Sequence, residues 1–173
     1  MVLGHEIARE LSLPLDIIVT RKITHPMNPE YAIGVVDENG TTIFNERESA
    51  SVNKQWLKEE ISKQKTEAGR RSVLYRKGKN QFDVEGKVVI IADDGIATGF
   101  TMCLAIRAVK SRVPRKIIIA VPVAPQESIN ELKGEEADEI IILENPEDFL
   151  GAVGAHYIEF DQINDEEVTR LLN

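Results

Sequence analysis

The chain has 173 residues, 42% of them hydrophobic, so it can bury the core of one domain but not the cores of two ordinary ones. Its net charge of −8, single cysteine and three scattered histidines argue against non-specific nucleic-acid binding, an internal disulfide and a structural metal site. No apolar run reaches the roughly 20 residues that span a bilayer, and the first residues lack a signal-peptide pattern. We therefore expect one cytoplasmic domain, residues 1–173. We also expect that it binds neither nucleic acid nor membrane.

The first elements predicted along the chain are a helix and a strand. Apolar residues at helical spacing predict a helix at residues 4–11, and a short apolar run predicts a buried strand at residues 15–20. Two β-prone runs, 31–37 and 41–44, then flank Asn39-Gly40. This dipeptide predicts a β-hairpin because both of its positions accept positive φ.

The second part of the chain alternates between helices and short apolar strands. Spacings of three and four residues predict an amphipathic helix from Ser49 to about Tyr75, with Gly69 as a point of interruption. The later segments are a strand at 88–92, a helix at 99–112, a strand at 116–123, a short helix near 126–133, a strand at 139–143 and a helix at 165–172. This alternation predicts an α/β fold, a mostly parallel sheet flanked by helices, with the β-hairpin as an insertion.

The acidic residues are concentrated towards the C-terminus. Residues 127–173 carry 14 acidic and 2 basic side chains, so residues 1–126 are net positive despite the overall charge. A positive region of this size suits a compact polyanion, and small phosphorylated ligands fit it better than a nucleic acid does.

The segment VVIIADDGIATGFT joins two carboxylates to a run of small residues. Ligands of open parallel sheets bind beyond the carboxyl ends of the strands, which is where Asp93 and Asp94 are expected. The run Gly95–Gly99 leads into a helix, so backbone N–H groups and the hydroxyls of Thr98 and Thr101 can converge on an anion. A ribose 5-phosphate satisfies both features, because its 2′ and 3′ hydroxyls can donate to the carboxylates while its phosphate lies in the loop.

Two alternatives stay open from these residues alone. Asp93 and Asp94 could cap the next helix at a solvated turn, with the glycines serving backbone geometry only. The paired aspartates could also be direct magnesium ligands, although the sequence shows no second acidic motif at a strand end.

The same segment resembles the phosphoribosyl pyrophosphate binding motif of type I phosphoribosyltransferases. The resemblance extends through LPLDIIVTRKITHPMNPEYAIGVV, VPVAP and AVGAHYIEFDQINDEEVTRLL to members of that family whose acceptor is unassigned. It implies that Asp93 and Asp94 bind the ribose hydroxyls and that the following residues surround the 5-phosphate. These residues are Gly95, Ile96, Ala97, Thr98, Gly99, Phe100 and Thr101.

The resemblance also singles out Arg21 and Lys22, which follow the predicted strand at 15–20. An Arg-Lys pair at the corresponding position of the similar orotate phosphoribosyltransferases implies contact with pyrophosphate, so both are candidate catalytic residues. The alternative for this pair is a solvated strand end. The later basic residues Arg70, Arg71, Arg76, Lys77 and Lys79 are interpreted as structural, since cations late in a helix complement its dipole.

The sequence departs from the family pattern at its start. Members of this family usually begin with a further strand that ends in a glycine-rich pyrophosphate loop, whereas this sequence starts at the helix predicted for 4–11. We therefore expect an unfilled position in the sheet, which another chain or segment has to cover, and hence a homo-oligomer. Phe149 and Tyr157 are candidate base contacts, with core packing as the alternative role.

The functional expectation combines the motif with the resemblance. We expect Mg²⁺-dependent transfer of the phosphoribosyl group of phosphoribosyl pyrophosphate to an unknown nitrogenous base, with Mg²⁺ carried by the substrate and not by direct protein ligands. One alternative is a non-catalytic regulatory protein that binds phosphoribosyl pyrophosphate or a nucleoside monophosphate. The other is a structural role within a larger assembly.

Overall fold

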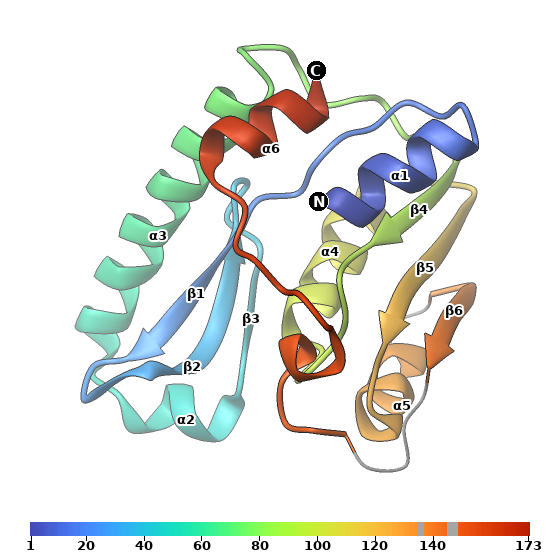
Figure 1. The fold of residues 1–173 in the computed structure, drawn as a ribbon. Helices are drawn as coiled ribbons and strands as arrows, with labels where there is room; N and C mark the ends of the chain where they lie inside the picture. The colour runs from blue at the N-terminus through green and yellow to red at the C-terminus, as the bar shows by residue number, and fades with distance from the viewer. Residues whose placement is uncertain (135–136, 145–148) are drawn as a thin grey trace.

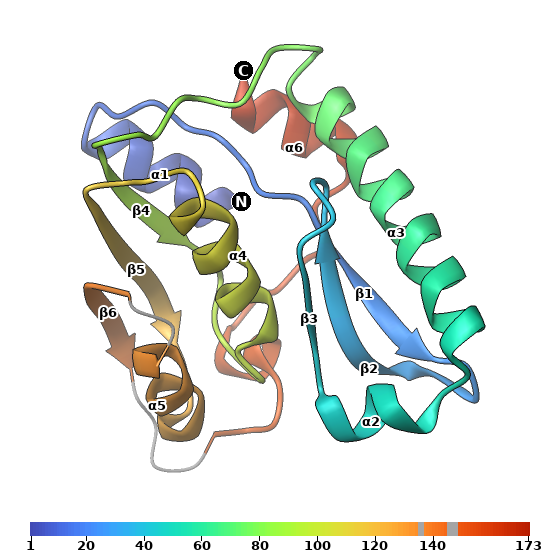
Figure 2. The ribbon, with the colours of Figure 1, turned by 180° about the vertical axis from the view of Figure 1, so that it is seen from behind.

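The structure is a computed structural model that describes residues 1–134, 137–144 and 149–173. These residues form an antiparallel sheet of order β1-β2-β3 and a parallel sheet of order β4-β5-β6, which lie next to each other (Figure 1). Helix α4 (Phe100–Lys110) lies between the two sheets, as the view from behind shows (Figure 2). The predicted α/β class is therefore confirmed, with a parallel sheet flanked by helices and a separate hairpin sheet. None of the helices in the described residues is both long and apolar enough to span a membrane.

The antiparallel sheet is formed by β1 (Thr20–His25), β2 (Asn28–Asp37) and β3 (Thr42–Phe44). The predicted hairpin joins β2 to β3, and Gly40 adopts a φ of 96° in the turn. The carboxylate of Asp37 accepts hydrogen bonds from the backbone N–H groups of the next turn residues, at 2.7 Å for both Gly40 and Thr41. The Asn-Gly signal thus predicted the hairpin correctly, although Gly40 alone of the pair takes a positive φ.

The helix predicted over Ser49–Tyr75 is instead two helices, α2 (Glu46–Ser51) and α3 (Lys54–Tyr75). Each begins after an asparagine whose side chain accepts hydrogen bonds from backbone N–H groups of the first turn. Asn45 caps α2 in this way, and Asn53 caps α3. Gly69 does not interrupt α3. Trp56, Leu57 and Ile61 of α3 pack on buried β1 and β2 residues, so this helix covers one face of the antiparallel sheet.

The parallel sheet is formed by β4 (Val88–Ala92), β5 (Lys116–Val123) and β6 (Glu139–Glu144), with α5 (Gln126–Gly134) between the last two strands. Every second residue of β5 is buried, so one face of this middle strand packs fully against the core while the other is partly exposed. By contrast, every residue of β4 is at least partly exposed, although VVIIA has the composition of a fully buried strand. The parallel strands and connecting helices agree with the prediction from the sequence.

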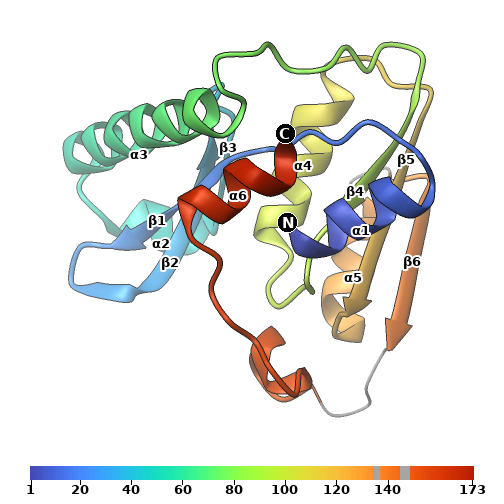
Figure 3. The ribbon, with the colours of Figure 1, turned by 45° about the horizontal axis from the view of Figure 1, so that its top comes forward.

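The first and last helices, α1 (Val2–Glu10) and α6 (Asp165–Leu172), lie on the same side of the molecule (Figure 3). The Nδ1 atom of His5 lies 2.8 Å from the carbonyl oxygen of Leu171, which joins the two helices directly. A short 3₁₀ helix, η1 (Val153–His156), precedes the irregular segment that leads to α6.

The prediction of a strand at residues 15–20 is wrong. Residues 13–19 have no sheet pairing, and β1 begins only at Thr20. Side chains take the place of a neighbouring strand here: the backbone N–H of Val19 donates to Glu38 Oε2 at 3.0 Å, and the carbonyl oxygen of Ile17 accepts a hydrogen bond from Arg76.

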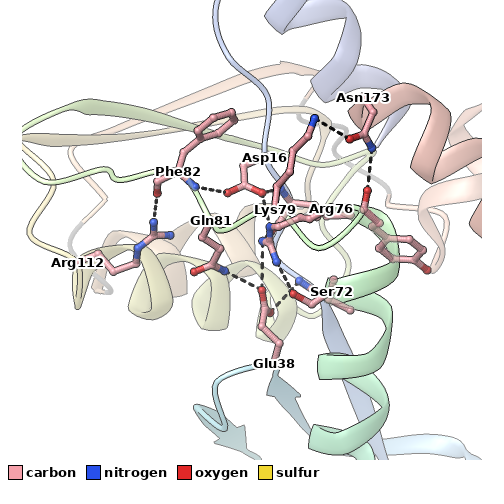
Figure 4. A network of polar contacts seen from close by, with 12 residues as sticks. Asp16, Glu38, Ser72, Arg76, Lys79, Gln81, Phe82, Arg112 and Asn173 are labelled. Atoms are coloured by element: carbon pink, nitrogen blue, oxygen red, sulfur yellow. Dashed lines mark hydrogen bonds and ion pairs between the residues drawn. The ribbon is translucent and has the colours of Figure 1, made fainter.

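Arg76 organises this region from the C-terminal end of α3 (Figure 4). Its side chain is only 6% exposed, and its Nε atom lies 2.7 Å from Asp16 Oδ1. It also pairs with Glu38 at 3.4 Å and donates to Ser72 Oγ. Burial raises the pKa of Glu38, and the Arg76 charge opposes that effect. This network fixes residues 16–19 to the hairpin and to α3.

Candidate functional site

The candidate site lies where the chain leaves β4 at the carboxyl end of the parallel sheet. The N–H of Asp93 donates to the carbonyl oxygen of Ala120 on β5 at 3.4 Å, and the N–H of Ile96 donates to that of Val123 at 2.9 Å. Ile96 is also buried among core residues. These anchors hold both ends of the Asp93–Ile96 turn against β5, so the two aspartates stand at the sheet edge as the sequence predicted.

The carboxylate of Asp93 lies in a largely buried environment next to Asp94. The N–H of Asp94 donates to Asp93 Oδ1 at 3.0 Å. Burial, together with the nearby Asp94 charge, raises the pKa of Asp93 to about 6. A carboxylate in this position is short of hydrogen-bond donors, since the protein supplies it with a single backbone N–H in the described contacts. The pair is therefore suited to a ligand that brings donors, such as vicinal hydroxyls.

The loop between Ile96 and α4 is exposed at its middle residues. Ala97 and Thr98 are exposed, and Ser128 on α5 holds the loop by donating to the carbonyl oxygen of Ala97 at 2.6 Å. Gly99 is the N-cap residue of α4 with a φ of 76°, a left-handed conformation that glycine adopts without a steric cost. Among the described residues no side chain caps this helix, so its first N–H groups are left for an anion or solvent.

Residues 153–157 close one side of the site. Val153 packs against Gly95 so tightly that a Cβ atom on this glycine would lie 2.6 Å from Val153 Cγ1. The hydroxyl of Tyr157 donates to the carbonyl oxygen of Asp94. The rings of Phe149 and His156 stack with centroids 4.9 Å apart. Neither Phe149 nor Tyr157 is buried, so the core role considered for both is wrong, and Tyr157 reaches the site itself.

Arg21 and Lys22 lie on the antiparallel sheet, whereas this loop follows a strand of the parallel sheet. Both lie inside β1 of the antiparallel sheet and not at the end of a preceding strand, which corrects the predicted position. Arg21 Nε donates to Gln64 Oε1 on α3 at 3.1 Å, and Lys22 is exposed. Within the described residues, neither side chain forms a hydrogen bond or an ion pair with Asp93–Thr101. The assignment of Arg21 and Lys22 to the same site as the loop stays a prediction.

The basic residues of α3 serve the fold, as interpreted from the sequence. Arg70 and Arg71 both donate to Glu67, at 2.8 Å from each Nε atom. Arg76 is buried in the ion-pair network described above. Each of these three guanidinium groups is paired with a carboxylate of the fold.

The side chains in the described part of the chain do not include a cluster of three or more His, Cys, Asp and Glu that could hold a metal ion. Asp93 and Asp94 supply carboxylate oxygens of the type that Mg²⁺ prefers, but only as a pair. This donor set fits a magnesium ion that arrives already bound to a diphosphate better than one held by protein ligands alone.

Comparison with known proteins gives a consistent result. Residues 1–155 match the family model described as the phosphoribosyl transferase domain. A protein of Mycobacterium tuberculosis strain H37Rv, whose name assigns it provisionally to the phosphoribosyl transferases, is 34% identical over 170 residues, which are 97% of this chain and 38% of that protein. A ribose-phosphate pyrophosphokinase of Marinomonas sp. strain MWYL1 is 26% identical over 118 residues, which are 65% of this chain and 36% of that enzyme.

A solved structure extends the comparison to the fold. The crystal structure of TT1426 from Thermus thermophilus superposes with a TM-score of 0.78 at 36% identity, covering 99% of this chain and 81% of that one. The chain thus spans less than two fifths of the length of the curated relatives named above.

Proposed function

Because the chain belongs to the phosphoribosyl transferase family, we propose that it binds phosphoribosyl pyrophosphate at Asp93–Thr101 and transfers the phosphoribosyl group to a nitrogenous base. One observation carries this proposal: Asp93, whose carboxylate accepts a single backbone N–H among the described contacts, and Asp94 lie one short loop before a helix N-terminus without a side-chain cap. A ribose 5-phosphate has hydroxyl donors at one end and a dianion at the other.

The ribose is assigned to the aspartates. Its 2′ and 3′ hydroxyls are vicinal, and Asp93 and Asp94 are consecutive, so each hydroxyl can donate to its own carboxylate. A hydrogen bond to a charged group contributes about 1.5–3 kcal/mol. Burial of Asp93 strengthens this bond when the carboxylate is ionised, because few water molecules compete for it.

The 5-phosphate is assigned to the loop. Ala97 and Thr98 are exposed residues, and the N–H groups that begin α4 point away from the helix towards the same loop. The hydroxyls of Thr98 and Thr101 can add donors. The remaining residues of the loop fix its path: Gly95, Ile96, Gly99 and Phe100. Ile96 does so by packing in the hydrophobic core.

The proposed reaction breaks the bond between the anomeric carbon and the pyrophosphate oxygen while a nitrogen of the acceptor bonds to that carbon. The electron pair of the broken bond leaves with pyrophosphate, and Mg²⁺ carried by the substrate offsets its charge. Arg21 and Lys22 are proposed to add positive charge on the pyrophosphate side. For Arg21 this requires exchange of its hydrogen bond to Gln64 for one to the ligand.

Isothermal titration calorimetry with phosphoribosyl pyrophosphate and Mg²⁺ tests the site. Loss of two charge-assisted hydrogen bonds in Asp93→Asn/Asp94→Asn should weaken binding by about 10²–10⁴-fold. Asp83→Asn is the matched control, because Asp83 is an exposed aspartate before β4 and should leave affinity unchanged. If the folded double variant binds as tightly as the wild type, the site assignment is wrong.

Release of pyrophosphate separates transfer from binding alone. The wild type is incubated with phosphoribosyl pyrophosphate, Mg²⁺ and a panel of purine, pyrimidine and pyridine bases. Turnover that depends on one base identifies the acceptor class. Tight binding without turnover on any base would instead support the non-catalytic, regulatory alternative.

A further inference from the structure

Two side-chain hydroxyl groups hold the candidate site from outside the segment Asp93–Thr101. Ser128 Oγ on α5 donates to the carbonyl oxygen of Ala97 at 2.6 Å. The hydroxyl of Tyr157, which follows η1, donates to the carbonyl oxygen of Asp94. Because a peptide group is planar, a carbonyl that is held in one direction also fixes the direction of the N–H group in the same peptide.

The bond from Ser128 orients the peptide between Ala97 and Thr98. This peptide is trans, so its C=O and N–H groups point in opposite directions. Ser128 is only 4% exposed, whereas Ala97 and Thr98 are exposed, so the carbonyl group points into the protein. The N–H group of Thr98 therefore points outwards, on the open side of the loop.

The direction of this peptide decides whether the loop attracts or repels an anion. Backbone N–H groups that converge in a loop attract an anion, whereas a carbonyl oxygen carries a partial negative charge and repels it. If the peptide turned over, the carbonyl oxygen of Ala97 would take the place of the Thr98 N–H group beside the proposed 5-phosphate. The bond to Ser128 stabilises the orientation that presents the donor.

The bond from Tyr157 acts on the backbone of Asp94. The N–H group of Asp94 donates to Asp93 Oδ1 at 3.0 Å, so both polar backbone groups of Asp94 have partners. Their directions fix where the Asp94 side chain leaves the backbone. The Tyr157 ring is itself held by Phe160, with ring centroids 5.1 Å apart. Burial, together with the charges of Asp94 and Asp93, raises the pKa of Tyr157, so its hydroxyl remains a donor at neutral pH.

We propose that Ser128 and Tyr157 are positioning residues for the two ends of the ligand, Ser128 for the phosphate and Tyr157 for the ribose hydroxyls. Each acts through a backbone carbonyl group of the loop and has no need to touch the ligand. Both roles rest on the proposed binding of phosphoribosyl pyrophosphate at Asp93–Thr101. Because the two hydroxyls act on different parts of the loop, their effects on binding are separable.

Two ligands separate these roles in isothermal titration calorimetry. Ribose 5-phosphate carries the phosphate and the hydroxyl groups, whereas tetrahydrofurfuryl phosphate keeps the ring and the phosphate but lacks the ring hydroxyls. The ratio of their affinities for the same protein therefore measures recognition of the hydroxyls. Ser128→Ala should weaken binding of both ligands by about tenfold and leave this ratio unchanged. Tyr157→Phe should weaken binding of ribose 5-phosphate alone, so the ratio should fall by about tenfold.

Two matched variants remove similar hydroxyl groups away from the site. Ser111→Ala also removes a serine hydroxyl that donates to a backbone carbonyl, that of Ala108 at 2.9 Å. Tyr75→Phe removes a phenol hydroxyl that donates to Asp165 at 2.6 Å. Neither control should change the affinity for either ligand. Circular dichroism verifies that all four variants are folded at the temperature of the titration, and a general loss of stability would not change the ratio.

The outcomes distinguish the positioning roles from the binding site itself. If Ser128→Ala and Tyr157→Phe bind both ligands as tightly as the wild type does, the positioning roles are wrong and the site assignment stands. An equal loss of both ligands in Tyr157→Phe would overturn its role towards the ribose hydroxyls. A wild type that binds neither ligand would overturn the proposed site, and the two roles with it.

Discussion

Replacing Asp93 with asparagine should stabilise the protein without ligand at neutral pH. Burial and the Asp94 charge raise the pKa of Asp93 from 3.8 to about 6, so ionising this side chain costs the folded state free energy. A change of one pKa unit corresponds to about 1.4 kcal/mol, which makes the full cost about 3 kcal/mol. Partial exposure of the side chain reduces the expected gain to about 1–3 kcal/mol.

The sign of the effect sets its pH dependence. Between about pH 4 and pH 6 the folded state binds more protons at Asp93 than the unfolded state does, so wild-type stability falls as the pH rises through this window. Asparagine has no charge to acquire, and its carbonyl oxygen can still accept the N–H of Asp94. The advantage of the variant should therefore be smallest near pH 4 and complete above about pH 6.5.

Urea denaturation of both proteins at several values between pH 4 and pH 7.5 measures this difference. Asp83→Asn is again the control, since an exposed substitution should change stability by less than about 0.5 kcal/mol. If Asp93→Asn lowers the free energy of unfolding at pH 7.5, or raises it equally at pH 4 and pH 7.5, the argument from burial is refuted. A variant that is more stable but no longer binds phosphoribosyl pyrophosphate would show that the buried charge of Asp93 lowers stability and serves ligand binding.

Two further predictions concern the scaffold. Arg76→Met should lower the free energy of unfolding in urea by about 3–5 kcal/mol, because it leaves the Asp16 and Glu38 carboxylates without their cation; a loss below 1 kcal/mol would contradict this role. Gly95→Ala should lower the melting temperature and cost about 1–3 kcal/mol, since its Cβ would lie 2.6 Å from a methyl group. In Gly69→Ala the added Cβ atom would have no neighbour within 4 Å, so this variant should instead stabilise α3 by about 0.5–1 kcal/mol. If the two alanine variants change stability equally, the packing argument is refuted.

The sequence alone predicted elements whose signals are local. The turn at Asn39-Gly40, strand β5 and helix α6 form where spacing and turn residues place them. The split between α2 and α3 also had a local signal, because Asn53 is a favoured N-cap residue within an otherwise periodic run. Apolar periodicity alone obscured that boundary.

The features that could not be predicted depend on contacts between distant residues. Residues 15–19 have the composition of a strand, but a strand also needs a partner, and here the Arg76 and Glu38 side chains bind the backbone instead. The sequence assigns Arg76 only a general role as a cation that complements a helix dipole, whereas the fold buries it in an ion-pair network. Tyr157 reaches Asp94 across 63 positions of sequence, a contact that no local pattern encodes.

The contact between α1 and α6, made through His5 and Leu171, brings the two ends of this chain to one face of the molecule. Polypeptide joined to either end would leave from that shared face, so the fold can be carried as a module inside a longer protein with both junctions on one side. The same proximity makes the fold suitable for circular permutation, in which a short linker joins residues 1 and 173 and new ends open at an exposed turn.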